Sequence, residues 1–275
     1  MLEAELSFAL ELADRADALS MEYFRTDLHV REKPDSSPVT EADVRVERLL
    51  RGAIEDRFPT DAVLGEEDGL DGEGSRRWIL DPIDGTKNYA DGVQVWATLI
   101  CLEIDGEPLL GVVSAPALGE RYQAVRGEGA MLNNRQIHPS RADRIDRAFV
   151  VFNDAADWVD GEYAAGFGDI VRTARRARGF GDFWGHMLVA RGSADVMLQP
   201  SLATWDWAAL QVVVKEAGGR MSTLEGDVLR HGGSVLTSNG RLHDEVIVRL
   251  AHGRRESRVP GRDPLTTSEP DRGAD

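Results

Sequence analysis

The stretch of sequence that decides the fold reads Trp78-Ile79-Leu80-Asp81-Pro82-Ile83-Asp84-Gly85-Thr86-Lys87-Asn88-Tyr89. Its three leading apolar residues predict the end of a buried strand, and the two acids that follow bracket a proline. We therefore expect Asp81 and Asp84 to leave the sheet together and to converge. Two carboxylates 4 Å apart repel each other by about 1 kcal/mol in water and about 4 kcal/mol at an effective dielectric of 20, unless a cation lies between them.

The same stretch indicates a site for a metal ion and an anion. Carboxylate oxygens suit Mg²⁺, which commonly binds together with a substrate phosphate. Gly85 and Thr86 follow at once and offer backbone N–H groups at an expected helix N-terminus, a geometry that binds anions. An Asp-rich turn without a metal is the alternative interpretation of these residues.

Length and charge narrow the classes of protein to consider. A chain of 275 residues, 42% of them hydrophobic, can bury a substantial core as one large domain or as two halves that share an interface. The formal net charge of −16 disfavours nonspecific binding to nucleic acid or to anionic membranes. A site for a phosphate ester would therefore have to be made locally positive by metal.

Compartment and redox chemistry are constrained by what the sequence lacks. It has no run of about 18 uncharged apolar residues, the length that a membrane span requires. Glu3, Glu5 and Glu11 stand where a signal peptide would have a basic segment. Cys101 is the only cysteine, which excludes an internal disulfide and a cysteine-based zinc cluster, and we expect it to be a small buried hydrophobe. The expected location is the cytoplasm.

The first half of the chain is predicted to combine helices with antiparallel strands. Helical spacing predicts a packing helix over about 3–25, and Thr40-Glu41-Ala42-Asp43 begins a second helix with a capping-box pattern. A polar loop over Lys33-Pro38 separates the two. Strands are expected over 62–67, 93–102, 109–114, 121–125 and 129–132, the second and third of them forming a hairpin.

The second half is predicted to alternate strands with helices. We expect strands over 149–153, 175–180, 194–198 and 234–237, and helices over 161–173, 183–191 and 205–217. A short helix that ends at residue 250 is expected after the last strand. The fold class is therefore α/β, with an α+β half over 1–137 that carries most candidate metal ligands and an α/β half over 138–250. Residues 251–275 hold too little apolar surface to order themselves and are predicted to be a flexible tail.

Several motifs together carry a family resemblance. Gly65-Glu66-Glu67, Asp81-Pro82-Ile83-Asp84-Gly85-Thr86 and Trp205-Asp206, with Glu216-Ala217-Gly218-Gly219 closing the following helix, resemble the inositol monophosphatase superfamily. Its lesser motifs match Ser37-Pro38-Val39-Thr40-Glu41-Ala42-Asp43 and Gly127-Glu128-Gly129-Ala130. The resemblance thus runs from about Leu6 to Leu250.

Within the superfamily, three segments look most like the actinobacterial type of histidinol-phosphate phosphatase. They are Gly85-Thr86-Lys87-Asn88-Tyr89, Val95-Trp96-Ala97-Thr98-Leu99-Ile100 and Gly179-Phe180-Gly181-Asp182-Phe183-Trp184. This implies a layered αβαβα sandwich and a Mg²⁺-dependent phosphomonoesterase, usually a homodimer, that acts on a small phosphate monoester.

The resemblance also implies a ligand set. One Mg²⁺ would be held by Glu66, Asp81 and the backbone carbonyl of Ile83, and a second by Asp81, Asp84 and Asp206. A third, looser ion would contact Glu66. Such a pair of ions can activate an attacking water on one side and neutralise the leaving oxygen on the other.

Two further residues are expected to act on that water. Thr86, supported by Asp43, would orient or deprotonate it. Asp43 also fits the capping-box position of its helix, and both roles can hold together.

The substrate is expected to contact residues from both halves. Asp182 could pair with a protonated amine or an imidazole, although a helix N-cap is its alternative role. Gln199 stands where inositol and histidinol phosphatases are both expected to have Glu, and His186 is expected to be a packing histidine. The full predicted set is Asp84, Gly85, Thr86, Lys87, Arg178, Asp182, Phe183, Gln199 and Asp206.

The predicted function is hydrolysis of L-histidinol phosphate to L-histidinol and phosphate, a step of histidine biosynthesis. The alternatives are an inositol-1-phosphate phosphatase and a 3′-phosphonucleotide phosphatase, whose branch also has a lysine at the position of Lys87. A dimeric interaction protein with vestigial activity is the non-enzymatic alternative, against which the complete set of ligands argues.

Overall fold

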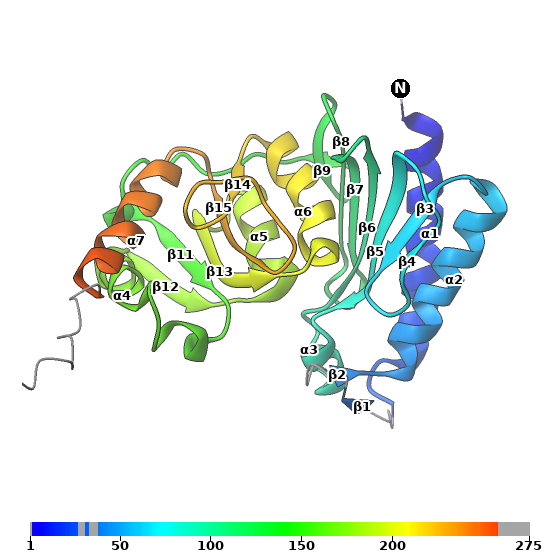
Figure 1. Ribbon diagram of the computed structural model, residues 1–275, viewed down its shortest axis with the longest axis horizontal. Coiled ribbons are helices and arrows are strands. Elements are labelled where there is room, and N and C mark those ends of the chain that lie inside the picture. Colours follow the sequence, from blue (N-terminus) through cyan, green and yellow to red (C-terminus); the bar gives the residue numbers. More distant parts are fainter. Residues whose placement is uncertain (1, 27–30, 33–37, 258–275) are drawn as a thin grey trace, which may run out of the picture.

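The fold is a stack of alternating helical and sheet layers, seen edge-on in Figure 1. The structure, a computed structural model, describes residues 2–26, 31–32 and 38–257. From one side to the other, a helix pair, a sheet, a second helix pair, a second sheet and a third helix pair follow one another. This order confirms the predicted αβαβα sandwich.

The first layer consists of α1 (Glu3–Tyr23) and α2 (Glu41–Arg57), which cover the outer face of the larger sheet. Their buried faces meet Trp78, Leu80 and Ile100 of the sheet in one apolar cluster. The backbone N–H of Thr40 and the side chain of Asp43 form the capping box that the sequence predicted.

The larger sheet is almost entirely antiparallel, and only β3 and β5 pair in parallel. The hairpin between β6 and β7 turns at Asp105 and Gly106, both with positive φ (53° and 80°), as a two-residue turn favours. The strand order is β10-β9-β8-β7-β6-β5-β3-β4, with β3 (Ala62–Gly65), β4 (Gly69–Asp71), β5 (Arg76–Asp84), β6 (Ala97–Ile104), β7 (Glu107–Ala115), β8 (Glu120–Val125), β9 (Gly129–Leu132) and β10 (Arg135–Gln136).

The middle layer consists of α5 (Asp182–Ala190) and α6 (Thr204–Ala217). A Cβ at Gly111 of β7 would lie 2.5 Å from the carbonyl oxygen of Ala209, so only a glycine lets α6 approach the sheet this closely. As predicted, α6 ends at a glycine with positive φ, Gly218 (99°).

The smaller sheet mixes parallel and antiparallel pairs. β11 (Phe149–Phe152) runs parallel to β12 (Arg176–Gly179) and β13 (Val196–Leu202), whereas β15 (Gly233–Ser238) runs antiparallel to β13 and to β14 (Arg220–Ser222). β14 is only three residues long and was not predicted. The two-residue strands β1 (Arg31–Glu32) and β2 (Pro38–Val39), which pair with each other, were not predicted either.

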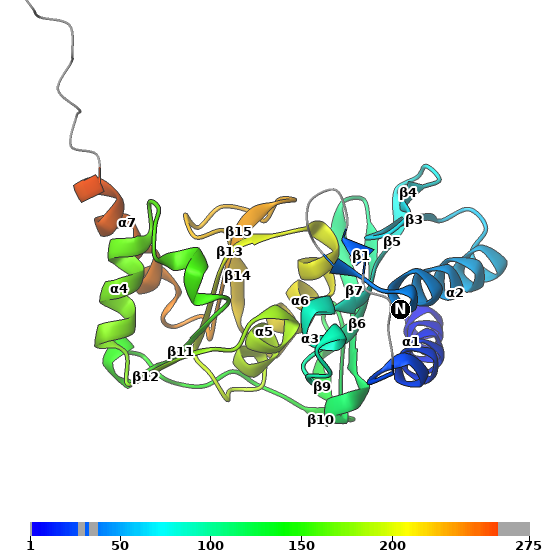
Figure 2. The ribbon, with the colours of Figure 1, turned by 90° about the horizontal axis from the view of Figure 1, so that it is seen from below.

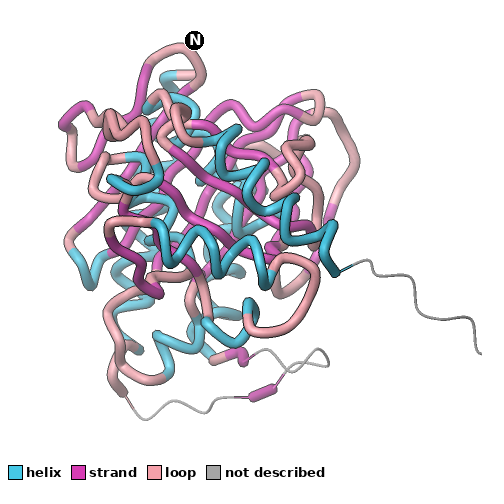
Figure 3. Tube along the Cα trace, turned by 90° about the vertical axis from the view of Figure 1, so that its left-hand side faces the viewer, coloured by secondary structure: helices cyan, strands magenta, loops and turns pink. Residues whose placement is uncertain are grey.

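The last layer consists of α4 (Ala164–Thr173) and α7 (His243–Ser257), which lie against the outer face of the smaller sheet (Figures 2 and 3). The prediction that this last helix stops at residue 250 was wrong, because helical backbone continues to Ser257. Before that extension, ion pairs join Arg249 to Glu245 one turn earlier and to Asp169 of α4. The remaining predicted tail, 258–275, and most of the predicted loop, 33–37, lie outside the described residues.

Three short helical turns and one short helix complete the chain: η1 (Pro116–Leu118), η2 (Ile145–Arg147), η3 (Ala155–Trp158) and α3 (Thr86–Ala90). Cys101 is fully buried in β6, as expected, and burial raises the pKa of its thiol. Among the described helices, none is both long and apolar enough to cross a membrane.

Candidate active site

Three carboxylates meet where β5 approaches the first turn of α6. Asp81, Asp84 and Asp206 each offer an oxygen, and these oxygens all lie within 4.8 Å of one another. The convergence of Asp81 and Asp84 has a local cause, since the pairing of β5 with β6 is irregular between them, across Pro82 and Ile83. β5 itself continues to Asp84 instead of ending at Leu80, so the predicted end of this strand was four residues too early.

Burial and mutual repulsion raise the pKa of each acid in this cluster. The pKa values of Asp81 and Asp84 lie well above their usual range, mainly because both are buried, and next because of Glu66 for Asp81 and Asp182 for Asp84. Burial also raises the pKa of Asp206 to about 7, although the backbone N–H of Ala203 donates to its Oδ2 at 2.8 Å. In the absence of a cation, the protein disfavours three charges here.

One carboxylate oxygen of the cluster is sealed inside the protein without a donor. Asp81 is 1% exposed, and its Oδ1 has no hydrogen-bond partner among the described residues. A buried anionic oxygen without a donor is strongly unfavourable unless a cation compensates it. Clustered hard oxygen donors are the set that binds divalent cations such as Mg²⁺, so the residues present fit the predicted metal.

The remaining predicted ligands lie beside the cluster. Glu66, directly after β3, and Ile83 line the same cavity of about 940 Å³ as the three aspartates. The charge of Glu66 contributes to the raised pKa values of Asp81 and Asp206. The carbonyl oxygen of Ile83 accepts a hydrogen bond from Thr86 Oγ1 at 3.0 Å and retains a second lone pair.

Asp43 joins the capping of α2 to this cavity. Its Oδ2 accepts a hydrogen bond from the backbone N–H of Thr40 at 2.8 Å, while its Oδ1 lies 3.3 Å from the hydroxyl of Thr86. Burial is the main reason that the pKa of Asp43 rises to about 6. One carboxyl group therefore caps a helix and contacts the threonine predicted to orient water.

Gly85 allows the close approach of three segments at the start of α3. It has φ +84°, and a Cβ there would lie 2.9 Å from the carbonyl oxygen of Val95 and 3.4 Å from Asp182 Oδ2. Lys87, one residue beyond Thr86, lines the cavity as well. Its charge acts to lower the pKa of Asp182, against the larger effect of burial.

Asp182 lines the same cavity and has an unusual backbone conformation. Its φ of 52° lies in the left-handed region, and Gly181, not Asp182, occupies the N-cap position of α5. The side chain is free of the alternative capping role, and its Oδ2 accepts a hydrogen bond from Asn88 Nδ2 at 2.7 Å. Burial, followed by the charge of Asp154, raises the pKa of Asp182 to about 6.

The other predicted substrate contacts divide into three cases. Gln199, on β13, is 4% exposed and lines the cavity. Phe183 is fully buried in the core between the layers, and its backbone N–H donates to Asp84. Arg178 lies on the edge strand β12 next to Gly179, which lines the cavity, but its own side chain is exposed and is not part of the lining. Its Nη1 donates to the carbonyl oxygen of Ala177 at 2.7 Å.

Several residues of this cavity were not predicted from the sequence. Asn88 donates to both Asp182 and the carbonyl oxygen of Val95, and its place three residues after Gly85 was the available signal. Asn153 and Asp154 also line the cavity without lying in any of the motifs, and Trp184 lines it from the end of the segment Gly179–Trp184.

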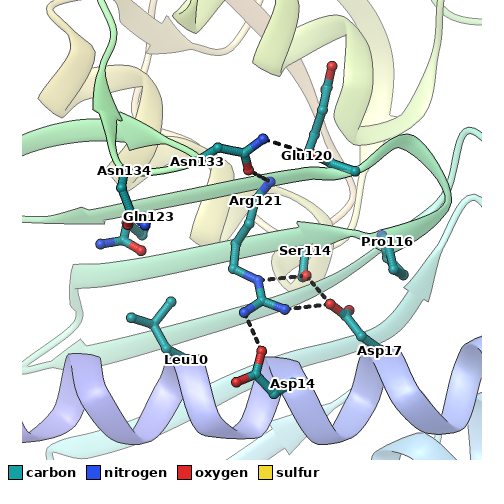
Figure 4. Close-up of a pocket in the computed structure, with 11 residues that line it drawn as sticks. Leu10, Asp14, Asp17, Ser114, Pro116, Glu120, Arg121, Gln123, Asn133 and Asn134 are labelled. Carbon is teal, nitrogen blue, oxygen red and sulfur yellow. Dashed lines mark hydrogen bonds and ion pairs between the residues drawn. The ribbon is translucent and has the colours of Figure 1, made fainter.

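A second cavity lies on the other side of the larger sheet, between α1 and the strands β7 and β8 (Figure 4). Arg121 dominates it, but its guanidinium already contacts Asp14, Asp17 and Ser114. In the described part of the chain, no metal-ligand cluster of the kind formed by the three aspartates occurs there. We therefore place the candidate active site at the cavity of Asp81.

The fold and this site define the class of protein. Residues 1–255 match the inositol monophosphatase family, and the chain belongs to it. The chain is therefore a phosphatase of this metal-dependent type, acting on small phosphate monoesters.

The chain is similar to individual members of this family in sequence and in structure. The chain is 45% identical over 253 residues to the histidinol-phosphatase of Streptomyces coelicolor, covering 88% of this chain and 95% of that protein. It is 44% identical over 264 residues to the histidinol-phosphatase of Mycobacterium tuberculosis, covering 92% of this chain and all of that protein. Among solved structures, the inositol monophosphatase of Anabaena superposes with a TM-score of 0.81 at 28% identity, covering 91% of this chain and 96% of the other.

Proposed function

We propose that this protein is a Mg²⁺-dependent phosphomonoesterase that hydrolyses L-histidinol phosphate to L-histidinol and phosphate. The observation that carries the proposal is the Asp182 carboxylate, which lines the same cavity as Asp81, Asp84 and Asp206. Histidinol phosphate carries an ammonium and an imidazole at a distance from its phosphate, and a carboxylate complements both. The two histidinol-phosphatases at 45% and 44% identity support the same substrate.

The proposed metal ligands follow from the donor set of the cavity. One Mg²⁺ would be held by Glu66, Asp81 and the carbonyl oxygen of Ile83. A second would be held by Asp81, Asp84 and Asp206, and a third, looser ion would contact Glu66. When bound, such ions supply Lewis-acid chemistry, lowering the pKa of the attacking water and neutralising charge on the leaving oxygen.

The residues around the cluster would bind and orient the reactants. The Thr86 hydroxyl has one hydrogen, which it can give to Ile83 O or to Asp43, so its lone pairs can accept a hydrogen bond from the attacking water. Asp43, with a pKa of about 6, is largely ionised at neutral pH and can take up a proton through Thr86. The backbone N–H groups of Gly85 and Thr86, with the charge of Lys87, would hold the phosphate oxygens.

The proposal extends to the setting of the enzyme. We expect a cytoplasmic homodimer that binds neither nucleic acid nor membranes. The net charge of −16 supports the last point, because polyanions and anionic lipid surfaces would be repelled.

A panel of phosphate monoesters tests the function. L-histidinol phosphate, inositol 1-phosphate and 3′-phosphoadenosine 5′-phosphate would be compared at equal Mg²⁺, and histidinol phosphate should have the highest kcat/KM. Inositol 1-phosphate is the second candidate, because the neutral amide of Gln199 suits a hydroxyl group. A preference for either alternative would overturn the substrate and leave the phosphatase class intact. A protein that releases no phosphate from any of them would support the interaction-protein alternative.

A further inference from the structure

A buried hydrogen-bonded chain lies behind the wall of the active-site cavity. Gln199 on β13 lines the cavity, and its Oε1 lies 3.3 Å from Nε2 of His186 on α5. The other ring nitrogen of His186, Nδ1, lies 2.7 Å from Oγ1 of Thr237 on β15. His186 and Thr237 are fully buried, so solvent does not supply alternative partners.

The surroundings of His186 fix its charge. Neither of its two hydrogen-bond partners is an acid, and burial lowers the pKa of the ring to about 4. The ring is therefore neutral at physiological pH, with one N–H donor and one lone-pair acceptor.

The identity of the atom that faces Nε2 then determines which group donates in each of the two hydrogen bonds. Because Gln199 presents its carbonyl oxygen, Nε2 must carry the ring hydrogen, and Nδ1 must accept the hydrogen bond from the Thr237 hydroxyl. The amide of Gln199 is thereby held with its oxygen inward. Among the described residues, none accepts a hydrogen bond from the NH₂ group of Gln199, which is left for the cavity.

We propose that His186 is a positioning residue that turns the NH₂ group of Gln199 into the cavity, where it donates a hydrogen bond to the unprotonated ring nitrogen of the substrate imidazole. This inference rests on the proposed function. The cavity would then carry two unlike groups: Asp182, an acceptor suited to the ammonium, and Gln199, a donor suited to the imidazole lone pair. A Glu at position 199 would present an acceptor instead of a donor. Recognition of the imidazole lone pair therefore needs the Gln at this position, and His186 fixes which way its amide points.

The kinetic test compares two substrates that differ only in the imidazole. Leucinol phosphate keeps the phosphate and the amine of histidinol phosphate but replaces the imidazole ring with an isopropyl group. His186→Phe removes the donor to Gln199 and should lower kcat/KM for histidinol phosphate by about 10-fold, mainly through KM, while leaving leucinol phosphate unchanged. His186→Gln places an amide N–H near the position of Nε2 and should restore most of the difference. Equal losses on both substrates, or no loss on histidinol phosphate, would overturn the inference.

A spectroscopic measurement tests the chain without any substrate. The ¹⁵N shifts of His186 in the full-length wild-type protein should show a neutral ring protonated at Nε2 between pH 5.5 and 8. Protonation at Nδ1 would reverse the chain and overturn the inference, even if the variant His186→Phe failed to fold. A wild-type protein that shows the Nε2–H form but does not hydrolyse histidinol phosphate would overturn the proposed function, and with it the imidazole as the group recognised.

Discussion

Asp84 accepts a hydrogen bond from the backbone N–H of Phe183 at 2.7 Å, across 99 residues of sequence. Asp84 belongs to the acidic cluster on the larger sheet, whereas Phe183 lies in the first turn of α5, next to Asp182. Asn88 forms a second link from α3 to Asp182 itself. Direct contacts between segments far apart in the sequence therefore hold the candidate metal site next to the wall that would select the substrate.

Asp84→Asn separates the charge of this residue from its hydrogen bond. The amide oxygen can still accept from Phe183 N–H, so the protein should fold, but the metal site loses one anion. We expect the fall in kcat/KM to exceed the roughly 10- to 100-fold loss typical when an outer partner of a metal ligand is removed. Phosphate release across a Mg²⁺ titration, together with a thermal melt, measures both effects.

Asp81→Asn should behave in the same way, and Asp91→Asn, at an exposed acid, is the charge-matched control. Near-normal turnover of Asp84→Asn at moderate Mg²⁺ would refute the assignment of two metal ions to this cluster.

The metal-free protein should become more stable as pH falls from about 8 to about 5. The folded-state pKa values are about 6 for Asp43 and Asp182 and about 7 for Asp206, all above the unfolded value of about 3.9. Asp81 and Asp84 also have raised pKa values, whereas buried His186 and His243, with pKa values lowered to about 4, act in the opposite direction. The acids outnumber the histidines, so the folded state binds more protons than the unfolded state in this window and its relative stability rises as the acids protonate. Thermal melts in EDTA at several pH values measure this trend.

Mg²⁺ should reduce this dependence on pH. At pH 8 the ion binds the folded state and should raise the melting temperature by mass action. If stability in EDTA fell on acidification over this range, the raised pKa values would be contradicted. If the melting temperature did not respond to Mg²⁺, the metal site would be contradicted.

Asp43 allows capping and catalysis to be measured separately. Asp43→Asn keeps an oxygen that can accept from Thr40 N–H, so the melting temperature should change little while kcat falls with the loss of the carboxylate. Asp43→Ala removes both functions and should also destabilise α2 by about 1 kcal/mol. Activity assays and melts of both variants are the measurement, and unchanged kcat in Asp43→Asn would leave Asp43 with the capping role alone.

The water-orienting role of Thr86 has its own matched pair. Thr86→Val keeps the shape but removes the hydroxyl and should lower kcat with little change in KM, whereas Thr86→Ser should retain most of the activity. Equal kcat values for the Val and Ser variants would exclude the hydroxyl from the reaction.

Some of this site was predictable from local sequence because short spacing leaves few geometries. Asp81 and Asp84 flank a proline at the end of an apolar run, and their convergence follows from the chain itself. Asp206 could be joined to them only through the family resemblance, since its meeting with Asp81 depends on how α6 packs on the larger sheet.

Other features depend on tertiary packing that no local pattern records. Arg178 was predicted to contact the substrate, and its exposure on the edge strand β12 could not be foreseen from the sequence; the contact itself stays a prediction. A helix N-cap was the alternative role for Asp182, but Gly181 occupies the N-cap position and Asp182 follows it with a left-handed backbone. The partners of Asn88 lie on segments that meet only in the folded chain.

Asp182 should determine the preference for an aminated substrate. Asp182→Asn keeps an oxygen for Asn88 and tolerates φ 52°, because asparagine is among the residues that adopt the left-handed region most readily. The loss of a charge-assisted hydrogen bond should lower the ratio of kcat/KM for histidinol phosphate to that for inositol 1-phosphate by about 10- to 200-fold.

Asp182→Ala should lower the ratio as well, but alanine is strained in this conformation by about 1 to 2 kcal/mol, so its melt must be recorded alongside. Asp160→Asn, at an exposed acid in the same half, controls for net charge. If Asp182→Asn weakened both substrates equally, Asp182 would act through the metal site it adjoins and not through the ammonium.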